Sequence, residues 1–131
     1  MPANPDEMAP RLLLCATCDG ANPQADRRAV SDALARAGLA QQVQIATVDC
    51  MGACENPGAL GFQGAGLAAY VFAGVRMVDD AADIALTCKA WLAAPQGWIG
   101  DARSCGRLRD CLRARLPAHG AVAGAEKTAP V

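Results

Sequence analysis

Residues 11–20 read RLLLCATCDG, an apolar run that passes directly into a short loop with cysteine and glycine. A short apolar run of this kind, bounded by turn residues, predicts a strand over residues 11–15. A helix is predicted next, over residues 22–38, because Asn22 is a favourable N-cap and Pro23 fits the first turn. The sequence therefore opens with a strand, a loop that carries cysteine, and a helix.

A second cysteine-bearing loop follows a second predicted strand. Residues 43–48, VQIATV, are mostly apolar and rich in β-branched side chains, which predicts a strand that is buried on both faces. Because a helix separates it from residues 11–15, we expect the two strands to be parallel and joined by a right-handed crossover. Parallel strands end at the same edge of a sheet. The two loops that follow them are therefore expected to meet at one rim.

The rest of the chain is predicted to form a hairpin and two helices. A turn at residues 56–58, NPG, precedes two apolar segments, residues 59–62 and 67–75, which we expect to pair. Residues 79–94 then repeat apolar side chains at helical spacing, and residues 101–116 do the same. The predicted order is β-α-β-β-β-α-α, and the predicted fold class is α/β, with a mixed sheet flanked by helices.

Length and charge predict one domain without nucleic-acid or membrane partners. The chain has 131 residues, and its formal charge of −1 gives no basic field for nucleic acid. No run approaches the roughly 18 apolar residues of a membrane span, and no signal peptide is recognisable, so we expect a cytoplasmic protein. We expect residues 1–10 to form a flexible arm, residues 11–116 the folded domain, and residues 117–131 a disordered tail of mostly alanine, glycine and proline.

The seven cysteines are the most informative residues. An odd number in a chain without an export signal argues against a disulfide framework and favours metal ligands or redox thiols. The one histidine, His119, lies in the expected tail, so a Rieske centre, a mixed Cys/His zinc site and a Ser-His-Asp triad have little support. The seven positions are Cys15, Cys18, Cys50, Cys54, Cys88, Cys105 and Cys111.

The cysteines expected at the rim form two motifs, C-x2-C at Cys15 and Cys18 and C-x3-C at Cys50 and Cys54. Four thiolates can hold either a [2Fe-2S] cluster or a tetrahedral zinc ion, and this spacing fits both. We favour a cluster, because the predicted core does not need zinc to fold and the small residues of the loops let backbone N–H groups approach sulfur. The third possibility is thiol–disulfide exchange by Cys15 and Cys18.

The other three cysteines are expected to have structural roles. Cys88 and Cys105 lie on the apolar faces of predicted helices, where an unmodified thiol behaves as a small hydrophobic group. Cys111 lies roughly 120° around the last predicted helix from Cys105, so the two are not expected to ligate one metal. We expect Cys111 to be partly exposed and open to oxidation.

Two surface features bear on partners. An unpaired strand edge on the predicted hairpin is a ready site for association, so we expect a homodimer. No carboxylate pair, phosphate loop or well-placed histidine marks a substrate site, and we do not expect an enzyme. The last predicted helix carries five arginines, interpreted as a solvated face or as a docking patch for an acidic redox partner: Arg103, Arg107, Arg109, Arg113 and Arg115.

The sequence also resembles known families. Residues 50–54, CMGAC, followed by Asn56-Pro57, an apolar hairpin and residues 70–72, YVF, resemble the thioredoxin-like [2Fe-2S] ferredoxins. These include the small cluster-bearing subunit of NADH dehydrogenases and hydrogenases. The sequence is more similar to a domain-of-unknown-function family of predicted metal-binding, thioredoxin-like proteins, over about residues 11–117. The matching segments are LLLCATC at 12–18, VDCMGAC at 48–54, APQGW at 94–98 and residues 107–117.

The resemblance implies a thioredoxin-like fold and a cluster held by Cys15, Cys18, Cys50 and Cys54. It implies an electron carrier that serves a redox partner protein, and the genes that accompany such relatives suggest a role in cobalamin or metal metabolism. The respiratory subunit spaces its first two cysteines more widely than the C-x2-C motif here. That difference keeps zinc as the alternative.

Overall fold

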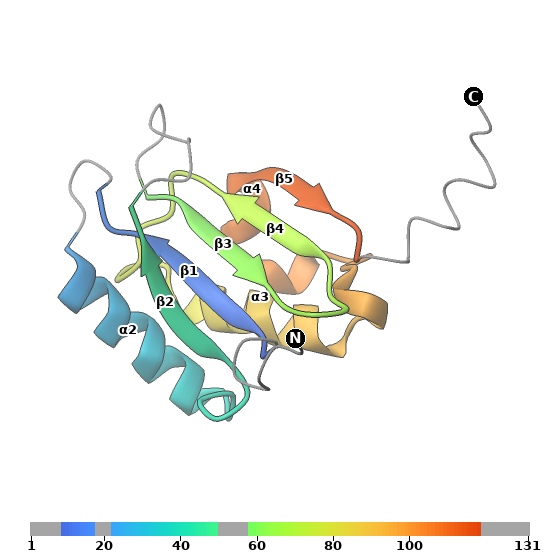
Figure 1. Ribbon diagram of the computed structural model, residues 1–131, viewed down its shortest axis with the longest axis horizontal. Helices are drawn as coiled ribbons and strands as arrows, with labels where there is room; N and C mark the ends of the chain where they lie inside the picture. Colours follow the sequence, from blue (N-terminus) through green and yellow to red (C-terminus); the bar gives the residue numbers. More distant parts are fainter. Residues whose placement is uncertain (1–8, 18–21, 50–57, 119–131) are drawn as a thin grey trace, which may run out of the picture.

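The computed structural model describes residues 9–17, 22–49 and 58–118, which form a mixed α/β structure around one five-stranded sheet (Figure 1). The predicted α/β class is confirmed, and a mixed sheet flanked by helices is compatible with a thioredoxin-like fold. The strand order in the sheet is β2-β1-β3-β4-β5. The strands are β1 (Arg11–Cys15), β2 (Gln44–Val48), β3 (Leu60–Gln63), β4 (Ala69–Phe72) and β5 (Leu112–Leu116). The helices are α2 (Pro23–Arg36), α3 (Ala81–Ala93) and the short α4 (Leu108–Cys111), with 3-10 turns η1 (Pro95–Gly97) and η2 (Arg103–Cys105).

The first three elements fold as the sequence predicts. β1 and β2 pair in parallel, with Cys15 opposite Val48 at their carboxyl ends. The connection runs through α2, where the side chain of Asn22 accepts a hydrogen bond from the Ala25 N–H at 3.2 Å and caps the helix. As a result, β1 and β2 end side by side at one edge of the sheet (Figure 1).

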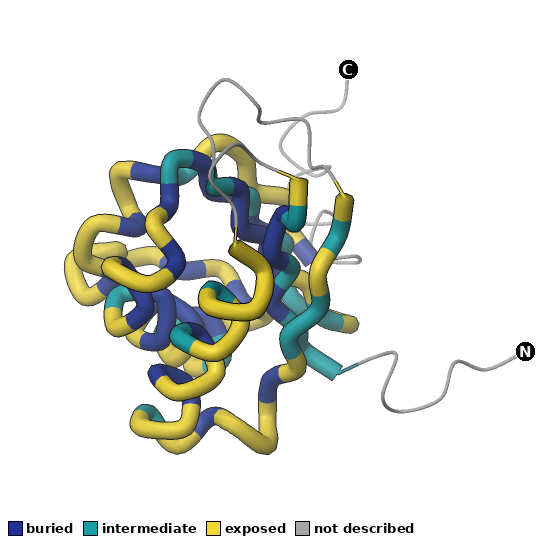
Figure 2. The backbone as a smooth tube through the Cα atoms, turned by 90° about the vertical axis from the view of Figure 1, so that its left-hand side faces the viewer, coloured by how far each residue is buried: buried dark blue, intermediate teal, exposed yellow. Residues whose placement is uncertain are grey.

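One face of the sheet holds the core. Because side chains alternate along a strand, every second residue of the three central strands turns to this face. These residues are buried: Leu12, Leu14, Leu60, Phe62, Tyr70 and Phe72. Both α2 and α3 pack here and lie against each other, and the ring of Trp91 on α3 is 5.2 Å from that of Phe62. Buried positions therefore lie in the interior, while the outer turns of the helices are exposed (Figure 2).

Residues 101–116 do not form the predicted helix. They form η2, then α4, then β5, which pairs antiparallel with β4. Gly106 interrupts the helix with a φ of +61°, and the Asp83 carboxylate occupies the space that a side chain at residue 106 would need. The otherwise open edge of β4 offers backbone partners to the residues beyond. Strand pairing therefore overrides the helical spacing of the apolar residues in this segment.

Two further expectations about the strands are wrong. β2 is not buried on both faces, because it is an edge strand in which Gln44 and Thr47 are exposed. The hairpin of β3 and β4 does not leave an open edge, because β5 covers it. The homodimer stays a prediction, and β2 and β5 are the two edge strands among the strands that the structure describes. On β5, Arg113 and Arg115 oppose pairing with a second copy of the same strand, since like charges would face each other.

The ends of the chain lie largely outside the described residues, as do most of the arm expected at residues 1–10 and of the tail expected at 117–131. Within those two segments, the Pro10 carbonyl accepts a hydrogen bond from the Gln44 N–H at 2.9 Å, and Ala118 is buried. None of the described helices is long and apolar enough to cross a membrane.

Candidate functional site

The candidate site is built around Cys15, the last residue of β1. Its side chain is buried, and its backbone N–H donates to the Ala59 carbonyl at 3.2 Å, just before β3 begins. On the other side, the Ala16 N–H donates to the Val48 carbonyl at 2.8 Å, which extends the β1–β2 ladder by one residue. Cys15 is therefore held between the end of β2 and the start of β3.

The first cysteine loop contacts the start of the second through Asp49. The hydroxyl of Thr17 donates to the Asp49 carbonyl, and the sulfur of Cys15 lies 3.5 Å from the same carbonyl oxygen. Asp49 is the residue immediately before Cys50. Thr17 was not among the predicted site residues; the signal for it is a hydroxyl residue placed inside the C-x2-C motif.

The far end of the second loop returns to the same place. Gly58 follows residues 50–57, and its carbonyl accepts a hydrogen bond from the Val75 N–H at 3.0 Å. The next residue, Ala59, is fully buried and accepts the hydrogen bond from Cys15. The described residues on either side of this segment, Asp49 and Ala59, therefore both contact Cys15.

Three of the four predicted ligands, Cys18, Cys50 and Cys54, lie outside the described residues, so their convergence on Cys15 stays a prediction. Within residues 9–17, 22–49 and 58–118, no three Cys, His, Asp or Glu side chains are grouped to hold a metal ion.

Helix α2 adds an electrostatic feature to this end of the molecule. It begins at Pro23, close to where β1 and β2 end, and runs away from that rim (Figure 1). The first N–H groups of a helix carry partial positive charge, which favours anions near them. A cluster ligated by four thiolates is anionic, so the positive end of α2 would stabilise such a group at this rim.

A comparison with known families identifies the chain. The family model described as "Protein of unknown function (DUF1636)" matches residues 12–118. The chain belongs to the DUF1636 family. The match begins one residue into β1, covers the other four strands and both long helices, and includes all four cysteines of the two rim motifs. No curated protein and no solved structure matches the chain.

The remaining cysteines of this DUF1636 protein are core residues. Cys88, Cys105 and Cys111 are unpaired thiols, and each is at most 4% exposed. Burial raises the pKa of Cys88 to about 12, and burial also raises the pKa of Cys111 despite the nearby Arg107 guanidinium. The expectation that Cys111 is partly exposed is wrong, because it ends α4 inside the core and Arg107 lies 3.4 Å from its sulfur.

The arginines of the DUF1636 protein's last segment do not share one helical face. Arg107 donates to the buried carboxylate of Asp80 at 2.7 Å and also to the Gly74 carbonyl. Arg103, by contrast, pairs at the surface with Asp101 at 2.6 Å. The expectation that these arginines form a docking patch on one helix is therefore wrong.

Proposed function

We propose that this DUF1636 protein binds a [2Fe-2S] cluster through Cys15, Cys18, Cys50 and Cys54 and serves a protein partner as a one-electron carrier. The observation that supports this most is that Asp49 and Ala59, which flank the segment containing Cys50 and Cys54, both contact Cys15. Flanking contacts of this kind favour a site in which Cys50 and Cys54 act together with Cys15. When bound, such a cluster accepts and releases a single electron, and its potential depends on burial, charge and hydrogen bonds to sulfur.

The residues around Cys15 fit a thiolate ligand. A ligating cysteine must lose its proton, and its sulfur then no longer donates to the Asp49 carbonyl. The Thr17 hydroxyl donates to that carbonyl as well, so deprotonation of Cys15 leaves the carbonyl with a partner. The chemistry of the donor set agrees, because thiolates suit iron–sulfur clusters and zinc.

The core supports the choice of a cluster over structural zinc. Small domains that depend on zinc for folding usually lack a sufficient hydrophobic core. Here Trp91, Phe62 and Leu60 are each at most 1% exposed and belong to one hydrophobic cluster. The described fold therefore has its own source of stability, and the cysteines are available for another purpose.

The test is the metal content and spectrum of the protein purified without oxygen. The proposal predicts a brown protein with about two irons and two acid-labile sulfides per chain, which gives an EPR signal after reduction with dithionite. A colourless protein with about one zinc per chain would contradict it and support the zinc alternative. A metal-free protein in which Cys15 and Cys18 form a reversible disulfide would instead support thiol–disulfide exchange.

A further inference from the structure

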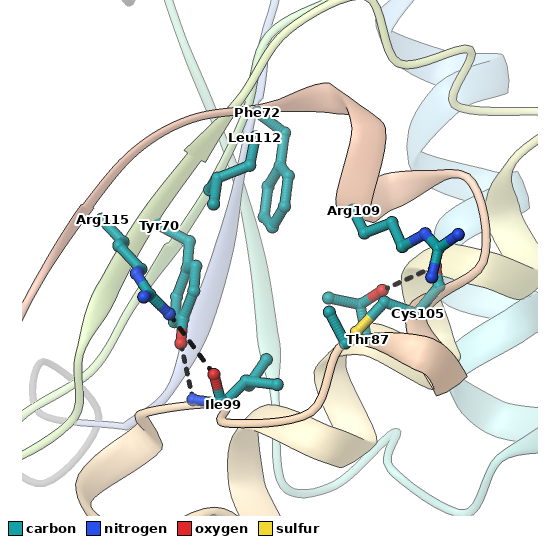
Figure 3. A pocket seen from close by; sticks show the side chains of 9 residues that line it. Tyr70, Phe72, Thr87, Ile99, Cys105, Arg109, Leu112 and Arg115 are labelled. Carbon is teal, nitrogen blue, oxygen red and sulfur yellow. Dashed lines mark hydrogen bonds between the residues drawn. The ribbon is translucent and has the colours of Figure 1, made fainter.

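A small cavity lies between the β4–β5 side of the sheet and the segment that follows α3 (Figure 3). Its volume is about 70 Å³, and its walls are formed by Tyr70, Phe72, Ile99 and Leu112. Two cationic side chains, Arg109 and Arg115, also line it, and Figure 3 shows them on opposite sides of the cavity. The other described lining residues are Thr87, Ala102 and Cys105. No carboxylate belongs to the described residues that line it.

The hydroxyl groups in the walls are already used within the protein. The Tyr70 hydroxyl donates to the Gly97 carbonyl at 3.0 Å and accepts from the Ile99 N–H at 2.8 Å. The Thr87 hydroxyl lies 2.7 Å from the Asp83 carbonyl, to which it donates. Because these hydroxyl protons are committed, the walls offer a ligand an apolar surface, and the guanidinium groups are its principal hydrogen-bond donors.

A bulge in the sheet brings Arg115 to the cavity. Tyr70 pairs with Arg115 and Phe72 pairs with Leu112, so a spacing of two on β4 faces a spacing of three on β5. Residues directly opposite each other in a sheet share a face, and the extra residue on β5 therefore puts both Leu112 and Arg115 on the cavity side. Without that extra residue, the two side chains would point to opposite faces.

The two arginines differ in how they are held. The guanidinium of Arg115 lies 3.9 Å above the Trp98 ring centre and donates to the Ile99 carbonyl at 3.3 Å, which fixes it in place. Arg109 is exposed and makes no hydrogen bond or ion pair with any residue that the structure describes. Arg109 is thus a cation at the edge of an apolar cavity, and the N–H groups of its guanidinium are available to a ligand.

We propose that this cavity binds a small aliphatic carboxylate, with the hydrocarbon chain among Tyr70, Phe72 and Leu112 and the carboxylate paired with Arg109. A guanidinium can hold a carboxylate through two parallel hydrogen bonds. The volume of about 70 Å³ is roughly half of the 150 Å³ that holds benzene in an engineered cavity, so a short branched chain fits better than an aromatic ring. None of the described residues that line the cavity belongs to a cysteine loop, and the proposal does not depend on the proposed cluster.

The test is a titration of the full-length protein with isovalerate, followed by NMR of the backbone amides. Shifts are expected at Tyr70, Ile99 and Leu112, with a Kd of about 1 mM, as suits a ligand with so few atoms. The neutral analogue 3-methylbutan-1-ol has the same branched chain and is expected to bind at least about tenfold more weakly. Equal binding of acid and alcohol, or no shift at these residues, would overturn the proposal.

Variants separate this site from general attraction to positive charge. Arg109→Gln should weaken isovalerate binding about tenfold, whereas Arg113→Gln should leave it unchanged, because Arg113 does not line the cavity. Ala102 is an exposed residue that lines the cavity, so Ala102→Leu should fill the cavity and abolish binding without disturbing the packing of the core. Equal losses in the Arg109 and Arg113 variants, or full binding by the Ala102 variant, would contradict the assignment.

Discussion

Replacing Gly58 with alanine should destabilise the protein at the point where the second cysteine loop rejoins the sheet. Gly58 has a φ of +97°, and a Cβ atom there would collide with the Val75 carbonyl. The Gly58 carbonyl also accepts the Val75 N–H at 3.0 Å, so the two backbones cannot separate without losing that bond. Backbone strain costs about 1–3 kcal/mol and the hydrogen bond about 1 kcal/mol, which gives roughly 2–4 kcal/mol in all.

Gly66→Ala is the matched control for this prediction. Gly66 has a φ of +73°, but a Cβ atom there would meet nothing within 4 Å. Its variant carries the conformational cost alone, about 1–2 kcal/mol. Thermal unfolding followed by circular dichroism should therefore give a midpoint for Gly58→Ala roughly 6 °C below that of Gly66→Ala. Equal midpoints for the two variants would refute the steric argument.

Three other predictions concern the core and its titratable groups. Trp91→Phe should lower the free energy of unfolding by about 2–3 kcal/mol, measured in urea. The substitution removes the indole N–H that donates to the Ala68 carbonyl at 2.8 Å, and the buried carbonyl stays unpaired. A loss under about 0.5 kcal/mol would contradict this. Because burial raises the pKa of Cys88 to about 12, the unfolded chain ionises first, and stability should fall as pH rises from about 9 towards 12, by up to about 1.4 kcal/mol per pH unit. Cys88→Ala should show a correspondingly shallower fall, and identical pH profiles would count against the buried neutral thiol. Arg107→Met should lower the free energy of unfolding by about 2 kcal/mol, because it leaves the buried Asp80 carboxylate without its cation. Adding Asp80→Asn to the same chain should restore part of that loss. Additive losses in the double variant would show that the two residues are not coupled.

The sequence predicted the part of the fold whose signals are local. An N-cap at Asn22, a helix of about four turns and two short apolar runs suffice to predict the parallel pair of strands. That pair in turn predicts that the loops after Cys15 and Val48 begin side by side, as the hydrogen bonds around Asp49 confirm. The buried positions of α3, including Cys88 and Trp91, followed from helical spacing in the same way.

Features that depend on distant contacts were not predictable. Cys105, Leu108, Leu112 and Leu116 recur at helical spacing, yet the chain bends at Gly106 and pairs with β4. The decisive contacts, the Asp83 carboxylate at Gly106 and the open edge of β4, lie far away in the sequence. The bulge that turns Arg115 towards the cavity likewise exists only once β4 and β5 are paired.

The most direct test of the proposed cluster is the iron content of single cysteine variants purified without oxygen. Cys15 and Cys88 are a matched pair, since both are buried, but only Cys15 lies at the rim where the cysteine loops begin. The proposal predicts that Cys15→Ala and Cys54→Ala each lose most of their iron, while Cys88→Ala retains the wild-type amount of about two per chain. Circular dichroism confirms that each variant is folded. Wild-type iron content in a folded Cys15→Ala and a folded Cys54→Ala protein would contradict the account.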